Sequence, residues 1–177
     1  MDVLSLDLSK SATGWARYRE GDARPTFGTW KLGNEYTDRA GAMVELYKRL
    51  NETCAFGEPD VVYYESPIRG DAQTNEYNNR LANALAALVE FYFKCKRVRC
   101  HEANNRAWKA TQLNPERKRL SSAEWKALSI RTARELGMKP GNDNEADALH
   151  ILDHGLALEN IVPPWRKDPP LPLGRVG

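Results

Sequence analysis

Three short strand-like segments at the start of the chain constrain the fold most strongly. They span residues 3–8, 13–19 and 25–31, and the turn-forming stretches "SKSATG" and "EGDARP" separate them. Connections this short join neighbouring antiparallel strands. The first part of the chain is therefore predicted to be a three-stranded antiparallel meander.

Helices and strands are predicted to alternate after the meander. In chain order we expect a helix at 37–54, a strand at 59–67, a helix at 74–93, a strand at 96–100, and helices at 121–136 and 144–158. Three antiparallel strands followed by such an alternation predict an α/β fold. Its mixed five-stranded sheet would hold three antiparallel strands and then two parallel ones, flanked by helices.

The length and composition suit one domain with an ordinary core. The chain has 177 residues, of which 41% are hydrophobic, and we expect a single domain over residues 1–160. Residues 161–177 are rich in proline and are expected to form an extended tail.

The chain has the features of a cytoplasmic protein. Its three cysteines form no CxxC pair and no even set, which suits a reducing compartment. No apolar run is long enough to span a membrane, and the start "MDVLSLDLSK" lacks the pattern of a signal peptide. We therefore expect a cytoplasmic protein with no membrane partner.

Asp7 is an unusual residue for its place in the chain, because it stands within the apolar first strand. A buried carboxylate is costly unless it is paired, hydrogen-bonded or bound to a metal. Glu65 ends the fourth strand, which in a mixed sheet of this kind can lie beside the first. The two acids are therefore expected to converge.

A third acidic cluster, "NDNEADALH" at residues 142–150, opens the last helix. Asn142 and Glu145 have the spacing of a capping box, which favours a structural role for Glu145. Asp147 shares a helix side with His150 and is expected to face the protein. Three acids directed at one place need a cation, and hard oxygen ligands select Mg²⁺ or Mn²⁺. Two such ions held by carboxylates are a standard arrangement for cleaving a phosphodiester.

Three segments resemble the RuvC-type Holliday junction resolvases. "LDLSKSATGWA" is similar to their first strand and turn, "VVYYESP" to the strand that bears an essential glutamate, and "EADALHI" to the final helix. The order and approximate spacings are similar too, and the resemblance covers most of residues 1–158. It implies a ribonuclease H-like fold and a homodimeric, metal-dependent endonuclease that nicks four-way DNA junctions in recombination and repair. A short, divergent member with a proline-rich tail also suits a phage origin.

The resemblance implies particular ligands for two Mg²⁺ or Mn²⁺ ions. Asp7, Glu65 and Asp147 would be the catalytic metal ligands, matched position by position. The family usually has Asp or His three positions before the last aspartate, where this chain has Asn144. The fourth ligand is then Asn144 itself, Asp143 one residue earlier, or Glu145.

The resemblance also assigns two further features. Lys109, in "RAWKATQ", would lie near the scissile phosphate and stabilise developing negative charge. The helix at 74–93 would be the dimerisation helix. Its apolar residues would be either shared between subunits or buried within one: Leu81, Leu85, Leu88 and Tyr92.

The net charge of +2 hides a basic segment at residues 97–134, which carries ten Lys or Arg against three Glu. Such a segment can bind DNA phosphates or form a solvated helical surface. The residues predicted to contact DNA are Lys109, Arg117, Lys118, Arg119 and Lys126. Trp108, Trp125 and His101 lie among these charges, where they can stack on bases or pack in the core.

Two other classes share parts of this pattern. Actin-like and sugar kinases also follow a first-strand acid with a Ser/Thr/Gly turn, but they need a second such domain to enclose ATP. We therefore expect no nucleotide cofactor. A catalytically weak, structure-selective DNA-binding protein of the same fold is the stronger alternative. In that case Asn144, in place of Asp or His, would be the cause of the weak catalysis.

Overall fold

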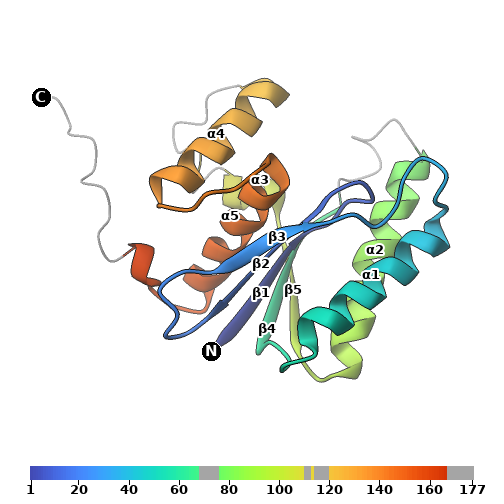
Figure 1. Ribbon diagram of the computed structural model, residues 1–177, viewed down its shortest axis with the longest axis horizontal. Helices are drawn as coiled ribbons and strands as arrows, with labels where there is room; N and C mark the ends of the chain where they lie inside the picture. Colours follow the sequence, from blue (N-terminus) through green and yellow to red (C-terminus); the bar gives the residue numbers. More distant parts are fainter. Residues whose placement is uncertain (68–75, 110–112, 114–119, 167–177) are drawn as a thin grey trace, which may run out of the picture.

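The computed structural model describes residues 1–67, 76–109, 113 and 120–166, and its centre is a five-stranded sheet (Figure 1). The strands are β1 (Asp2–Asp7), β2 (Thr13–Arg19), β3 (Thr26–Trp30), β4 (Val61–Glu65) and β5 (Arg99–Ala103). Their order in the sheet is β3-β2-β1-β4-β5. The first three pair antiparallel, and β4 and β5 continue the sheet in parallel to β1. The predicted sheet is confirmed.

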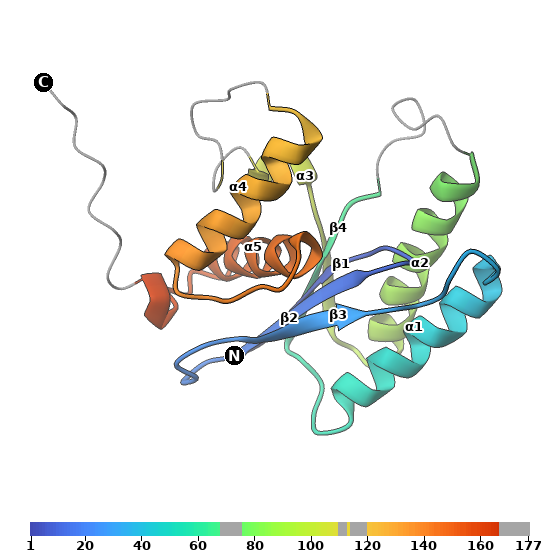
Figure 2. The ribbon, with the colours of Figure 1, turned by 45° about the horizontal axis from the view of Figure 1, so that its top comes forward.

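Helices cover both faces of the sheet (Figure 2). The helices are α1 (Arg39–Cys54), α2 (Glu76–Cys95), α3 (Asn105–Trp108), α4 (Ser122–Glu135) and α5 (Asp143–Leu158). Helices α1 and α2 pack on one face, and α5 packs on the other with α4 against it. No helix in the described part of the chain is long and apolar enough to cross a membrane.

The alternation of side chains along β1 separates two hydrophobic cores. Leu4 and Leu6 point into the core beneath α1 and α2, and Val3 points into the core beneath α5. Ser5 shares the face of Val3, and its hydroxyl donates a hydrogen bond of 2.7 Å to the carbonyl of Ala148 in α5. Asp7 comes next on this face, so the period of two directs it toward α5.

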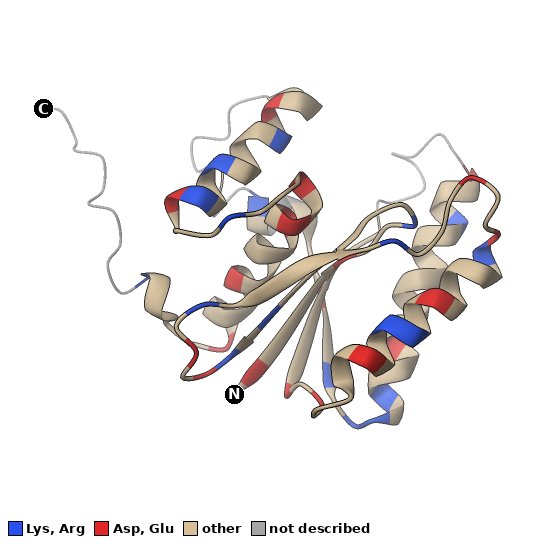
Figure 3. Ribbon diagram, in the orientation of Figure 1, with Lys and Arg blue, Asp and Glu red and all other residues tan. Residues whose placement is uncertain are grey.

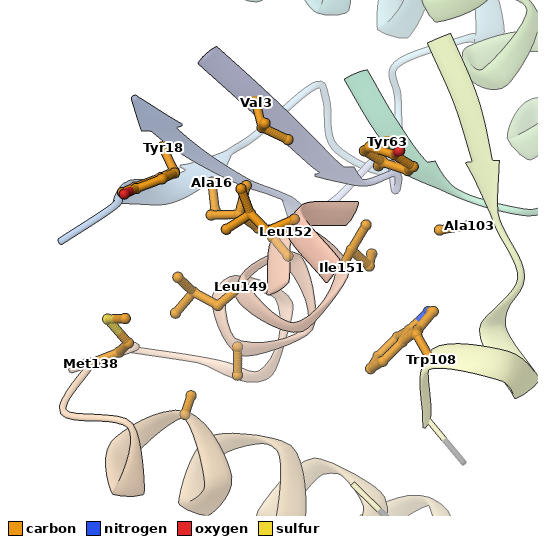
Figure 4. Close-up of a cluster of buried hydrophobic side chains, with 14 of the residues drawn as sticks. Val3, Ala16, Tyr18, Tyr63, Ala103, Trp108, Met138, Leu149, Ile151 and Leu152 are labelled. Atoms are coloured by element: carbon orange, nitrogen blue, oxygen red, sulfur yellow. The ribbon is translucent and has the colours of Figure 1, made fainter. Parts of the chain in front are cut away.

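The core beneath α5 also contains Trp108, which is fully buried (Figure 4). The core extends past the expected domain boundary at residue 160. Trp165, in the 3₁₀ helix η2 (Pro164–Arg166), is buried and packs edge-on against Tyr18. Packed structure therefore continues to Arg166, and the rest of the proline-rich tail lies outside the described residues.

Several predicted boundaries differ from the structure. Asp7 is the last residue of β1 rather than a residue within it. Strand β5 begins at Arg99, because Arg97 adopts a left-handed backbone (φ 60°) and the chain turns there after α2. Helix α1 is capped by Asp38, whose carboxylate accepts a hydrogen bond from the backbone N–H of Gly41.

Candidate active site

Asp7 and Glu65 lie side by side at one edge of the sheet. Strands β1 and β4 are adjacent and parallel, and Leu6 is paired with Tyr64 in their register. The next residue of each strand is the acid, so both carboxylates stand at the carboxyl ends of their strands. In open α/β sheets this edge is where ligands bind. The expected convergence of these two acids is confirmed.

The third acid reaches this edge from α5. The helix can approach closely because Gly14, which is paired with Asp7 across β1 and β2, has no side chain. A Cβ atom at Gly14 would lie 2.0 Å from the backbone oxygen of Asn144. Asp147 follows one turn later and lies near the sheet edge.

Lys109 joins the acids from the segment that follows α3. Its Nζ lies 3.7 Å from Oε1 of Glu65 and 3.8 Å from Oδ2 of Asp147. The ammonium also lies over the ring of Trp108, 4.8 Å from the ring centroid, which is a cation–π contact. The structure therefore brings together Asp7, Glu65, Asp147 and Lys109.

Burial and mutual repulsion disfavour the charges at this edge. Burial raises the pKa of Asp7 well above its usual range, and the negative charges of Glu65 and Asp147 raise it further. Burial also raises the pKa of Glu65, but a hydrogen bond from the Asp7 carboxyl lowers it in part. Both shifts have the same direction, so in the absence of another cation a proton on this pair of carboxyl groups is favoured. Groups perturbed in this way are typical of functional sites.

The donor set fits a hard divalent cation. Oε1 of Glu65 is buried and has no hydrogen-bond partner among the described residues, and Nζ of Lys109 is too distant for a hydrogen bond. Three carboxylates, one of which has an unsatisfied oxygen, are the kind of ligands that Mg²⁺ and Mn²⁺ prefer. Within the described ranges, no three His, Cys, Asp or Glu side chains are gathered tightly enough to enclose an ion unaided. The acids would have to draw closer around a cation, whose charge would favour their deprotonated forms.

The three candidates for a fourth ligand have different surroundings. Asp143 forms an ion pair with Lys126, with Oδ2 and Nζ 2.7 Å apart. Glu145 accepts hydrogen bonds from the backbone N–H of Gly141 and the hydroxyl of Thr29. The backbone of Asn144 passes against Gly14, beside Asp7. Asn142 caps α5 by accepting a hydrogen bond from the N–H of Glu145, which is one half of the predicted capping box. The other half differs, because the Glu145 carboxylate accepts from the N–H of Gly141 instead of that of Asn142.

The basic segment is only partly described. Lys126 lies on α4, where acidic and basic positions are mixed (Figure 3), and it is engaged by Asp143. The predicted DNA-contacting residues Arg117, Lys118 and Arg119 lie outside the described residues.

The aromatic residues of the basic segment divide between core and surface. Trp108 belongs to the core, Trp125 is half-buried against the same core, and His101 is exposed. Base stacking by Trp108 is therefore excluded. His150 is buried next to Trp108, at a ring-centroid distance of 6.2 Å.

Two residues at the site escaped the sequence reasoning. Ser129 of α4 donates a hydrogen bond to Oδ1 of Asp147, 18 positions along the chain. A serine in the middle of an amphipathic helix carries no signal of such a partner. The second residue is Gly14, whose missing side chain permits the close approach of α5. The pairing of Asp7 with Gly14 in a predicted hairpin was the available signal.

Comparisons with known proteins find likeness in structure alone. No protein-family model matches the chain, and no curated protein matches its sequence. Among solved structures, Thermus thermophilus RuvC in complex with a Holliday junction substrate is similar with a TM-score of 0.68 and 15% sequence identity. The likeness covers 90% of this chain and 96% of that one.

Two further resolvases have the same architecture. The fowlpox virus Holliday junction resolvase gives a TM-score of 0.60 at 11% identity, covering 90% of this chain and 99% of that one. The yeast mitochondrial Holliday junction resolvase gives 0.58 at 14% identity, covering 85% and 75%. The fold is therefore the ribonuclease H-like fold of these proteins.

Proposed function

We propose that the chain is a Holliday junction resolvase, a divalent-metal-dependent endonuclease that nicks four-way DNA junctions in recombination and repair. The observation that carries the proposal is the meeting of Asp7, Glu65 and Asp147 around Lys109 at the carboxyl edge of β1 and β4. The solved structures of the same fold include a resolvase bound to its junction, which supports branched DNA as the partner. The proposal is compatible with a bacterial cytoplasm or with a phage that replicates there.

Each residue has a distinct part in the proposed cleavage. Asp7 and Glu65 are held by neighbouring strands, so their carboxylates form the rigid side of the site, and Asp147 closes it from α5. Bound Mg²⁺ or Mn²⁺, two ions per site, would stabilise both the attacking and the leaving oxygen of the phosphodiester. Lys109 would hold positive charge beside the scissile phosphate, because its ammonium already lies within 4 Å of two of the acids.

Asn144 is the candidate that we favour as fourth ligand. Asp143 and Glu145 are engaged in the contacts described above. If Asp143 bound the metal, its ion pair with Lys126 would be lost, and if Glu145 did, its hydrogen bond from Gly141 at the start of α5 would be lost. An amide oxygen binds Mg²⁺ more weakly than a carboxylate does. The proposed site therefore has three strong ligands and one weak one.

A cleavage assay tests the proposal directly. A labelled four-way junction and a linear duplex of the same sequence are incubated with the full chain in Mg²⁺ and in EDTA. Paired nicks in the junction alone, and only with Mg²⁺, are expected. The variants Asp7→Asn, Glu65→Gln and Asp147→Asn should bind the junction yet cleave it about 100-fold more slowly or worse, since metal stabilisation is worth several kcal/mol.

The matched control is Glu135→Gln, an exposed acid on α4 that pairs with Arg131. It should cleave like the wild type. Junction binding without any Mg²⁺-dependent cleavage would instead favour the catalytically weak DNA-binding protein, and cleavage of duplex and junction alike would favour a broader nuclease of this fold.

A further inference from the structure

The structure assigns to Ser129 the role of a positioning residue for the metal site, which holds the Asp147 carboxylate in one orientation. This inference rests on the proposed function, because it concerns how that site binds a divalent cation. Ser129 lies on α4 and touches none of the reacting groups itself. It acts through Asp147 of α5, against which α4 packs.

The two oxygens of the Asp147 carboxylate have different partners, and the hydroxyl of Ser129 is one of them. Its Oγ donates a hydrogen bond of 2.5 Å to Oδ1, and Oδ2 is the oxygen that lies 3.8 Å from Nζ of Lys109. Ser129 is only 2% exposed, so water does not compete for this bond. The carboxylate is thus prevented from rotating, and one oxygen remains on the side of Lys109.

The backbone of Ser129 is held as well. Nε2 of His150 lies 2.9 Å from the carbonyl oxygen of Ser129. A carbonyl only accepts, so Nε2 carries the hydrogen and donates it. His150 follows Asp147 by one helical turn, so the two polar groups of Ser129 meet two side chains on the same face of α5. Helix α4 is thereby fixed in rotation relative to α5.

The same network extends to the segment that bears Lys109. The ring of His150 stacks on Trp108 with an interplanar angle of 20°. Trp108 is fully buried at the end of α3 and directly precedes Lys109. Asp147 and Lys109 therefore share one buried support, built from residues of three helices. Partners behind a ligand of this kind typically change metal affinity 10–100-fold when removed.

Metal binding by the full chain, without DNA, tests the inference. Mn²⁺ is titrated into the protein and the free ion is measured by electron paramagnetic resonance. Ser129→Ala is expected to raise the dissociation constant about 10-fold or more, and Asp147→Asn sets the scale for loss of the ligand. The matched control is Ser122→Ala, an exposed serine on the same helix, which should leave the constant unchanged.

A second variant separates positioning from packing. Ser129→Cys is close in volume but its thiol is a weak donor, so it should keep the thermal unfolding midpoint near wild type and still weaken Mn²⁺ binding. In cleavage, both variants should need more Mn²⁺ for half-maximal rate, with the rate largely restored at saturating Mn²⁺. A merely structural serine would lower the unfolding midpoint and leave the dissociation constant of the folded protein unchanged.

The outcomes separate this inference from the proposed function. Wild-type affinity in folded Ser129→Cys and Ser129→Ala would overturn the positioning role, while junction cleavage would still stand. Weakened Mn²⁺ binding in a chain that cleaves no junction would support the role and overturn the resolvase activity. Equal Mn²⁺ binding by wild type and Asp147→Asn would overturn Asp147 as a metal ligand and with it the positioning role of Ser129, while the cleavage assay alone decides the resolvase activity.

Discussion

Asp7 shows how one residue can serve function at the expense of stability. Its pKa is raised by burial and by the charges of Glu65 and Asp147, so the folded chain binds a proton that the unfolded chain releases. Below the usual pKa of an aspartate, Asp7 is protonated in both the folded and the unfolded chain, so its raised pKa does not lower the stability there. As pH rises from about 4 through the raised pKa, the folded state loses stability relative to the unfolded state.

Asp7→Asn is therefore expected to stabilise the metal-free protein while it removes cleavage. The amide carries no charge to be buried, so the unfolding midpoint should rise by a few degrees at pH 8, where 1 kcal/mol corresponds to roughly 2–4 °C in a chain of this size. The gain should shrink toward pH 4. Thermal unfolding followed by circular dichroism in EDTA measures both. A lower midpoint at pH 8 would mean that the carboxyl group contributes more by hydrogen bonding than it costs by burial.

At the scale of elements, the approach of α5 to the β1–β2 hairpin decides where Asp147 stands. The first turn of α5 lies so close to Gly14 that the α-hydrogen of glycine fits between them but a Cβ atom does not. The contact is to backbone atoms of Asn144, which cannot move as a flexible side chain would. Any side chain at this position must displace the start of the helix.

Gly14→Ala is accordingly expected to impair the site more than the fold. Overpacking of this kind typically costs about 1–3 kcal/mol, and the displaced helix should reduce junction cleavage far more than the remaining folded fraction explains. Gly141→Ala is the matched control, because its Cβ would meet only Oε2 of Glu145 at an ordinary 3.5 Å. Cleavage rates at a temperature where both variants are folded, together with unfolding midpoints, provide the comparison. Near-normal cleavage by folded Gly14→Ala would show that α5 can shift without moving Asp147 out of place.

For the whole molecule, resolution of a junction requires two matched nicks, and one chain supplies one set of acids. We therefore expect a two-fold symmetric dimer, the commonest closed assembly. The apolar residues Leu81, Leu85 and Tyr92 of α2 are buried within the subunit. A dimer that uses α2 must therefore use its outer face, where Phe91 is 68% exposed beside a groove formed with β5.

Sedimentation at micromolar concentration should show twice the mass of the chain. Leu85→Glu is expected to unfold the protein, since Leu85 is 1% exposed. Phe91→Glu should keep the fold and weaken the dimer if the outer face of α2 is the interface. Phe56→Glu, at a phenylalanine that is 91% exposed in the turn after α1, is the matched control. A wild-type monomer, both free and on a junction, would contradict paired incision and favour a single-strand nickase.

The sequence by itself determined the order of the five strands and of the four long helices, and it singled out the three acids. It did not predict the short helices α3 and η2. Turn residues, alternation along β1 and the cap at Asn142 act over a few neighbouring positions, so they can be recognised without knowing the rest of the fold. The RNase H-like sheet and the meeting of Asp7 with Glu65 followed from these local signals and from the resemblance of three motifs. The start of β5 was predicted too early in the chain, because the left-handed turn is at Arg97, and a turn of this kind is recognised in a sequence mainly by a glycine.

Only the tertiary structure decided which residues support the acids and which way α2 faces. The hydrogen bond from Ser129 to Asp147 joins helices whose contact depends on side-chain packing far along the chain. An apolar stripe such as that of α2 is the same whether it meets its own sheet or a second subunit. Trp108 likewise lies among charges in the sequence but within the core in space. Such choices depend on how separate elements bury one another, and no single segment encodes that.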